Sequence, residues 1–160
     1  MLKRIFPFVT IGALSAIGIM ALSPAAQAQN SSTFESAVIR PKFAPDPMQL
    51  KGVTGGKSTA KAVAGTAETE TGACLGFMDK QPYHRLELKQ RFRYLSIMAT
   101  SSTDTTMIIK GPGGVWCNDD YDEKNAGISG EWLPGGYDVW VGSYSKTKAV
   151  PYVLKISETR

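Results

Sequence analysis

The sequence contains few of the residues that most often carry out catalysis. Its 160 residues include one histidine, His84, and two cysteines, Cys74 and Cys117. A nucleophile that needs an imidazole base would therefore have to use His84. This histidine follows Pro82 and Tyr83 at the expected start of a strand, where a packed or hydrogen-bonded role is the ordinary one.

A strong net charge is also missing, because 18 Lys and Arg residues are balanced by 14 Asp and Glu residues. The sequence has no dense basic stripe and no arginines interleaved with aromatic residues, which argues against nucleic-acid binding. Beyond one apolar stretch near the N-terminus, no run is long enough to cross a bilayer. We therefore expect no nucleic-acid partner and no membrane span once that stretch is removed.

The apolar stretch Ile5–Leu22 follows Lys3 and Arg4 and precedes a small-residue site at Ala26–Ala28. This order predicts a secretory signal peptide over residues 1–28. No cysteine follows the predicted cut directly, so lipidation is not expected. Removing Lys3 and Arg4 leaves 16 basic and 14 acidic residues, a net charge of +2. The sequence thus predicts a periplasmic or secreted protein.

Residues 29–72 are rich in Pro, Gly, Ala, Thr and Lys and contain few large apolar side chains. This composition builds little core, so we expect an extended or flexible arm there. The capping-box spacing of Ser32 and Glu35 allows one short helix within it. The folded domain is predicted to span residues 73–160.

Six segments after Tyr83 show alternating apolar and polar residues, or short apolar runs between turns, both of which indicate strands. Turns are expected at Gly111–Gly114 and Leu133–Gly136. Because no long amphipathic helix separates the strands, we predict an all-β fold, an antiparallel β-sandwich of jelly-roll or Greek-key type. The predicted strands are 84–89, 92–100, 105–110, 128–133, 136–143 and 150–157.

The most distinctive chemistry lies between Trp116 and Glu123, where four acids and one amide occur within eight residues. Oxygen atoms at this density repel one another unless a cation lies among them, and Ca²⁺ accepts several such ligands. We therefore predict a Ca²⁺ site, with a solvated acidic turn as the alternative. The predicted ligands are Asp104, Asn118, Asp119, Asp120 and Asp122.

The two cysteines form an even pair in a chain that we expect to be exported, which predicts a disulfide between Cys74 and Cys117. The bridge would anchor the acidic segment. Gly72–Gly76 surrounds Cys74 with the spacing of a hydrolase nucleophile elbow, although no helical pattern follows it. A secreted hydrolase that uses Cys74 or His84 is therefore the alternative function.

Two aromatic residues, Trp140 and Tyr144, form a possible binding surface. Alternation places Trp140 on the more polar face of its strand, and Tyr144 lies further along. Exposed aromatic side chains can bind sugars or peptides. A core or edge position is the alternative for Trp140, whereas Trp132 is predicted to belong to the core.

The order of these signals from Asp104 to Glu158 resembles the bacterial pre-peptidase C-terminal domain family. The shared features are the acidic strand start at Asp104, the Gly-Pro turn at 111–114, the Asn-Asp-Asp motif at 118–120, the Gly-Tyr strand at 134–142 and the Tyr-x-Leu pattern at 152–154. The resemblance implies a jelly-roll-like sandwich, often stabilised by Ca²⁺, that has no catalytic activity and aids secretion, maturation or adhesion. The cysteine pair is not a general feature of that family.

These observations together predict an exported, non-catalytic β-sandwich with Ca²⁺ as its cofactor. We expect it to serve in binding, adhesion or structure at the periplasm or cell surface, with a protein or polysaccharide partner. The alternatives are the hydrolase described above and a structural envelope component that binds no small ligand.

Overall fold

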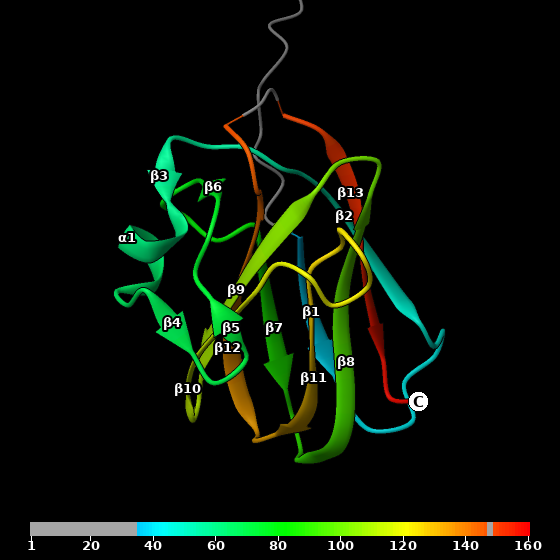
Figure 1. The fold of residues 1–160 in the computed structure, drawn as a ribbon. Coiled ribbons are helices and arrows are strands. Elements are labelled where there is room, and N and C mark those ends of the chain that lie inside the picture. The colour runs from blue at the N-terminus through cyan, green and yellow to red at the C-terminus, as the bar shows by residue number, and fades with distance from the viewer. Residues whose placement is uncertain (1–34, 147–148) are drawn as a thin grey trace, which may run out of the picture. The chain divides into compact units, whose positions relative to one another are not determined.

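The computed structural model describes residues 35–146 and 149–160, and the predicted signal peptide lies outside them. The all-β sandwich is confirmed (Figure 1). The strands are β1 (Glu35–Ile39), β2 (Met48–Val53), β3 (Ser58–Thr59), β4 (Glu68–Thr69), β5 (Gly72–Ala73), β6 (Phe77–Met78), β7 (His84–Leu88), β8 (Phe92–Ser101), β9 (Thr105–Gly111), β10 (Gly114–Asn118), β11 (Gly127–Trp132), β12 (Gly135–Ser143) and β13 (Pro151–Ser157); the helix is α1 (Ala60–Ala64).

The first sheet, sheet A, is centred on β12. β9 pairs with one edge of β12 and carries β10 on its far side, while β7 pairs with the other edge and carries β1. The short strands β6 and β3 continue the sheet from the end of β12. β1 runs parallel to β7, which departs from the purely antiparallel arrangement that we predicted.

The second sheet, sheet B, has the antiparallel order β11-β8-β13-β2. Its register shifts near the start of β8, because Gly130 lies opposite Leu95 whereas Trp132 lies opposite Phe92. This bulge inserts one extra residue into β8 and changes the phase of its alternation. Both Phe92 and Leu95 therefore reach the buried face of the sheet.

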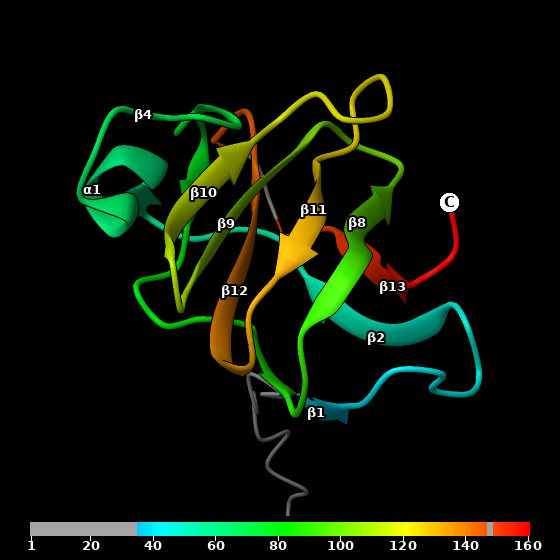
Figure 2. The same cartoon turned by 90° about the horizontal axis from the view of Figure 1, so that it is seen from below.

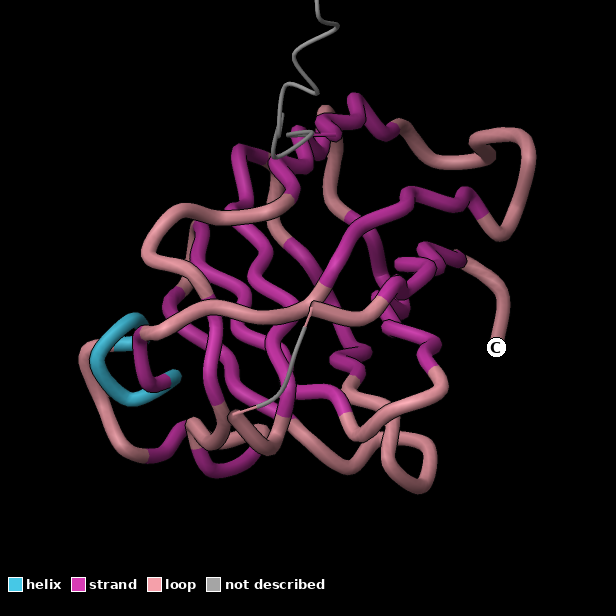
Figure 3. The backbone as a smooth tube through the Cα atoms, turned by 90° about the horizontal axis from the view of Figure 1, so that it is seen from above, coloured by secondary structure: helices cyan, strands magenta, loops and turns pink. Residues whose placement is uncertain are grey.

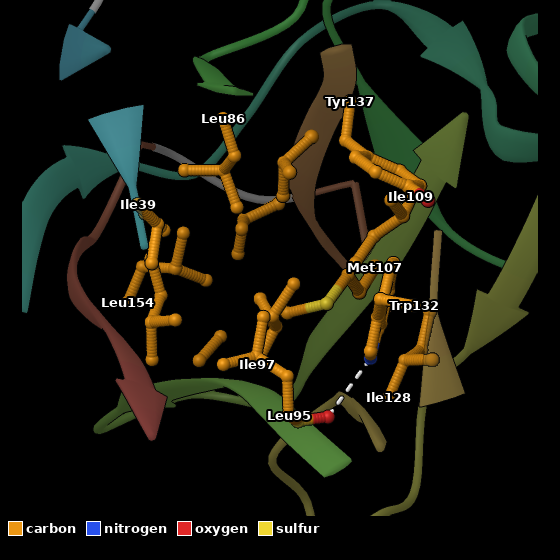
Figure 4. Packing of buried hydrophobic residues seen from close by; sticks show 14 of the residues in the cluster. Ile39, Leu86, Leu95, Ile97, Met107, Ile109, Ile128, Trp132, Tyr137 and Leu154 are labelled. Atoms are coloured by element: carbon orange, nitrogen blue, oxygen red, sulfur yellow. Dashed lines mark hydrogen bonds between the residues drawn. The ribbon is translucent and has the colours of Figure 1, made fainter. Parts of the chain in front are cut away.

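The main core lies between the inner faces of the two sheets (Figure 4). Leu86 and Tyr137 from sheet A pack against a layer from sheet B that includes Ile97 and Leu154. Trp132 is buried as predicted, and its indole N–H donates a hydrogen bond to the carbonyl of Leu95 at 2.9 Å. Full burial of a single aliphatic side chain of this core, such as Leu86 or Ile97, stabilises the fold by about 1.5–3 kcal/mol.

Sheet A is also covered on part of its outer face, over β9, β10 and β12. Ile108 and Trp140 point away from the main core and pack with Ala60 and Ala64 of α1 in a second buried cluster. Figure 2 shows α1 and β4 on the side of sheet A opposite to β8, β13 and β2. We call residues 58–80 the cover segment. Thr59 is the N-cap of its helix α1, because the Thr59 hydroxyl accepts a hydrogen bond from the N–H of Ala62.

The prediction of a poorly structured arm is corrected for residues 35–72. β1 and β2 extend the two sheets, and most of the cover segment lies in this range. The residues around Glu35 form a strand and not a short helix, because they pair with β7. Small residues such as Ala60 and Ala64 contribute little core by themselves but pack closely against a large neighbour, here Trp140.

The six predicted strands correspond to β7, β8, β9, β11, β12 and β13. β10 was not predicted, because its residues were assigned to the acidic segment. It forms a hairpin with β9 through Pro112 and Gly113, whose φ of 102° suits the third position of a type II turn. Within the described ranges, no helix is long and apolar enough to cross a membrane (α1 is cyan in Figure 3).

Candidate functional site

The acidic segment is divided between a strand and a loop. Trp116 and Cys117 belong to β10, where alternation turns them to opposite faces of sheet A. Trp116 packs beside Trp132 and Tyr137 at the main core, with ring centroids 5.5 and 6.2 Å away. Cys117 joins the second cluster. The loop that could bind a ligand therefore begins only after Asn118.

The disulfide between Cys74 and Cys117 is confirmed, and its Cα atoms are 5.1 Å apart. Threonines of the cover segment reinforce it: the Thr71 hydroxyl donates to the carbonyl of Cys117 at 2.8 Å, and the Thr69 hydroxyl accepts from its N–H at 3.0 Å. Both cysteines are buried. The bridge fixes the cover segment to β10 and removes Cys74 as a thiol nucleophile.

Three of the predicted ligands come close enough to interact electrostatically: Asp104, Asp119 and Asp120. Burial raises the pKa of Asp104, and the charge of Asp120 raises it further, while Lys124 lowers it. Burial likewise raises the pKa of Asp119, again with a contribution from Asp120. Mutual repulsion of this kind is what a bound cation would relieve.

Asp104 provides the most specific signal in this group. Its carbonyl accepts a hydrogen bond from the N–H of Tyr144 at 3.2 Å, which holds the backbone at the start of β9. Its carboxylate oxygen Oδ1 is buried and has no hydrogen-bond partner within the described part of the chain. An ionised oxygen in this position is destabilising unless a positive group approaches it.

The other two predicted ligands have different surroundings. Asn118 accepts a hydrogen bond from the N–H of Gly127 at 3.0 Å and donates to the carbonyl of Thr71 at 3.4 Å, so it joins the loop to β11 and to the cover segment. The backbone of Asp122 pairs with Asn125 across a tight turn. Among residues 35–146 and 149–160, no three His, Cys, Asp or Glu side chains are arranged to hold a metal ion.

The predicted aromatic surface is corrected for one of its two residues. Tyr144 is 47% exposed, but Trp140 is only 6% exposed because the cover segment lies over it. The indole N–H of Trp140 donates to the carbonyl of Lys80 at 3.3 Å, and the ammonium of Lys110 lies 5.7 Å from the ring centroid. Alternation placed Trp140 on the correct face, but that face is not exposed.

His84 is fully buried between the sheets and hydrogen-bonded through both ring nitrogens. Nδ1 lies 3.3 Å from the carbonyl of Glu35, and Nε2 lies 2.7 Å from the hydroxyl of Tyr152. Because a carbonyl can only accept, Nδ1 carries the proton and Nε2 accepts from Tyr152. Burial lowers the pKa of His84. The imidazole is therefore neutral and structural, as the ordinary interpretation of His84 predicted.

Gly52 makes this hydrogen bond possible, because a Cβ at that position would lie 2.2 Å from the Tyr152 hydroxyl oxygen. We expect Gly52→Ala to destabilise the fold by about 1–3 kcal/mol through overpacking, measured by urea denaturation. Gly130→Ala is the matched control in β11, at the opposite edge of the same sheet, since a Cβ there meets no atom within 4 Å. Equal stability of the two variants would contradict this steric role.

A shallow groove of about 700 Å³ lies where β2, β13 and the end of β8 meet. The sequence interpretation missed it, because it assigned β2 to the arm. The signal in the sequence was the alternation of apolar Met48 and Leu50 with polar Gln49 and Lys51. The groove is lined by Glu35, Lys51, Gly52, Val53, Thr100, Ser101, Ser102, Pro151, Tyr152 and Val153.

The chain is similar to several known proteins, although no family model matches it. An uncharacterized protein of Synechococcus elongatus is 25% identical over 147 residues, which span 89% of this chain and 94% of that protein. The solved pre-peptidase C-terminal domain of the collagenase from Bacillus anthracis has a TM-score of 0.44 and 11% identity, covering 78% of this chain and 96% of that one.

A second solved structure, the periplasmic inhibitor of g-type lysozyme from Aeromonas hydrophila, has a TM-score of 0.41 and 17% identity, with coverages of 77% and 96%. Because both TM-scores are below 0.5, they do not place this chain in either family. Membership in the pre-peptidase C-terminal family stays a prediction. What the coordinates establish is an all-β sandwich with a disulfide-anchored cover.

Proposed function

We propose that this chain is an exported, non-catalytic β-sandwich module that binds a protein or polysaccharide at the periplasm or cell surface. The observation that carries the proposal is the structural role of both candidate catalytic residues: Cys74 is bonded to Cys117, and both nitrogens of His84 are bonded within the core. Neither group can reach a substrate in this state. A buried disulfide also supports an oxidising compartment.

Mass spectrometry of the full chain expressed in a bacterium tests export and the absence of a reactive thiol together. We expect a processed protein that lacks residues 1–28, is found outside the cytoplasm and does not react with iodoacetamide until it is reduced. An unprocessed cytoplasmic protein with alkylated Cys74 would overturn the proposal and restore a thiol-based alternative.

The Ca²⁺ part of the proposal now concerns Asp104, Asp119 and Asp120. Their oxygen atoms are the ligand type that Ca²⁺ prefers, and the unpartnered Oδ1 of Asp104 is supporting evidence. The three carboxylates do not form a preassembled shell. A bound Ca²⁺ would add positive charge to that of Lys124 and would tie the start of β9 to the loop after β10.

Thermal unfolding with and without chelator tests this part. A ligand that binds only the folded state at a hundredfold excess over its Kd stabilises it by about 2.7 kcal/mol, so Ca²⁺ should raise the melting temperature. Asp120→Asn should remove the increase, and the control Asp122→Asn should retain it. The same melting temperature in Ca²⁺, in chelator and in NaCl of matched ionic strength would leave the segment as a solvated acidic turn.

A further inference from the structure

The outer faces of the two sheets differ in how they are covered. The cover segment buries the outer face of sheet A over β9, β10 and β12, whereas no described element packs over the corresponding face of sheet B on the side of β2 and β13. Figure 2 shows β2 and β13 on the side away from α1. We call this surface the open face; its outward residues are Gln49, Lys51 and Val53 of β2, Val153 and Lys155 of β13, and Met98 and Thr100 of β8.

Two lysines lie close together on the open face. Lys51 is opposite Val153, and Lys155 is two residues further along β13, so the two lysines occupy diagonal positions on neighbouring strands. Diagonal neighbours in a sheet are about 7–8 Å apart. Neither lysine makes an ion pair within residues 35–146 and 149–160. The two ammonium groups repel each other, and an anion bound between them would be attracted to both and would offset this repulsion.

The C-terminal end of β13 carries charges of both signs, since Glu158 lies there and its N–H donates a hydrogen bond to the carboxylate of Asp46 at 3.2 Å. The guanidinium of Arg160 lies 5.0 Å from the ring centroid of Tyr94, near the end of β13. On the far edge of sheet B, Glu131 is already paired with Arg91. The carboxylate of Glu35 accepts a hydrogen bond from the backbone N–H of Lys51 at 2.7 Å and so blocks strand addition at that edge.

The groove lies at the other end of β13, beside its first residues, and is lined by apolar and hydroxyl side chains. Val53, Val153 and Pro151 supply apolar surface, and Thr100 and Ser102 add hydroxyl groups at its side. The groove is shallow and open, whereas protein partners usually insert side chains into well-packed pockets. Apolar patches beside hydroxyl and ammonium groups match the C–H faces, hydroxyls and acidic groups of a sugar chain. The Glu35 carboxylate also lines the groove, where it accepts the hydrogen bond from the N–H of Lys51.

We propose that the open face binds a linear anionic polysaccharide that runs along β2 and β13. Lys51 and Lys155 contact its acidic groups, Gln49 and Thr100 contact its hydroxyls, and Val53 with Val153 contacts a sugar ring. The seven residues of β13 extend over about 23 Å, enough for several sugar units. This inference rests on the proposed binding function and specifies its ligand class and its surface.

Binding of the processed protein to immobilised polymers tests the proposal. The probes are polygalacturonate for carboxylates, dextran sulfate for sulfates, neutral dextran, and polyglutamate as an anionic polypeptide. The key variant is Lys51→Gln with Lys155→Gln, and the matched control is Lys57→Gln with Lys61→Gln, which removes the same charge from exposed residues of the cover side. All measurements are made in chelator, so that the result does not depend on the Ca²⁺ proposal.

We expect at least one of the acidic polysaccharides to bind, with affinity at least tenfold weaker for the Lys51 and Lys155 variant and unchanged for the control. Binding should also weaken as ionic strength rises. The preferred polymer distinguishes carboxylate from sulfate ligands. Equal losses in both variants, equal binding of polyglutamate or dextran, or no polysaccharide binding by a protein with normal melting would each overturn the proposal. A polyglutamate preference would point to a protein partner.

Discussion

Replacing both Cys74 and Cys117 with alanine is expected to lower the free energy of unfolding by about 4 kcal/mol. The disulfide closes a loop with a sequence separation of 43 residues, and the entropic model gives a stabilisation of this size for such a loop. Urea denaturation of the oxidised wild type and the double variant measures the difference. We expect the loss to be the largest of any change discussed for this protein.

The main core contains neither cysteine, so it should survive this substitution better than the cover segment does. Limited proteolysis of the double variant should therefore cut within residues 58–80 before it cuts the sheets. Wild-type protein in reductant provides the control, because it loses the same bond without a change of sequence. A stability loss below about 1 kcal/mol with unchanged proteolysis would show that the hydrogen bonds of Thr69 and Thr71 suffice to hold the cover segment.

Replacing His84 with leucine is expected to lower the free energy of unfolding by about 2–4 kcal/mol at neutral pH, which is the second largest loss that we expect. The substitution leaves the buried Tyr152 hydroxyl and the part-buried Glu35 carbonyl without their hydrogen-bond partner. It also removes the only histidine from the chain. Chemical denaturation across a pH series therefore measures two quantities: the loss of stability at neutral pH, and the disappearance of the pH dependence that His84 causes.

The sign of the pH effect follows from the lowered pKa of His84. The unfolded chain takes up a proton near the ordinary value of 6.5 while the folded chain resists it, so wild-type stability is complete above that pH and falls as the pH falls below it. Protonation at Nε2 would also turn the acceptor of the Tyr152 hydroxyl into a donor. Tyr152 and Tyr83 stay neutral throughout, since burial raises the pKa of each.

Tyr152→Phe is the matched control, because it removes the hydroxyl but keeps the histidine. It should retain the decline in stability as the pH falls below about 6.5, whereas His84→Leu should lack that decline. Asp104 and Asp119 act in the opposite direction at lower pH: their pKa values are raised, so their ionisation destabilises the fold and protonation relieves it. Parallel pH curves for wild type and His84→Leu would contradict the assignment of the decline to this residue.

Local patterns were sufficient for those parts of the fold that depend on neighbours in sequence. Alternation identified six strands, and the Pro-Gly turns marked several of their ends, because a strand that is buried on one face has a period of two in any context. The pairing of the only two cysteines was predicted correctly from their number and the expected compartment. The core position of Trp132 was predicted on the same basis.

The remaining errors arose where burial depends on contacts between distant segments. The strand state of β1 and β2 depends on pairing with β7 and β13, which lie far along the chain. Trp140 lies on the outer face of sheet A, where only the cover segment decides that it is buried. The five predicted Ca²⁺ ligands separate for the same reason: Asn118 is used in hydrogen bonds to distant backbone groups, and Asp122 turns back on Asn125.

The sequence by itself determined the strand segments, the sandwich class and the disulfide partners, since these follow from periodicity, turn residues and a single pair of cysteines. The tertiary structure decided which faces are open, because exposure is a property of what packs on a surface and not of the residues in it. It covered Trp140 with the segment 58–80 and left Lys51 and Lys155 together on the uncovered side of sheet B.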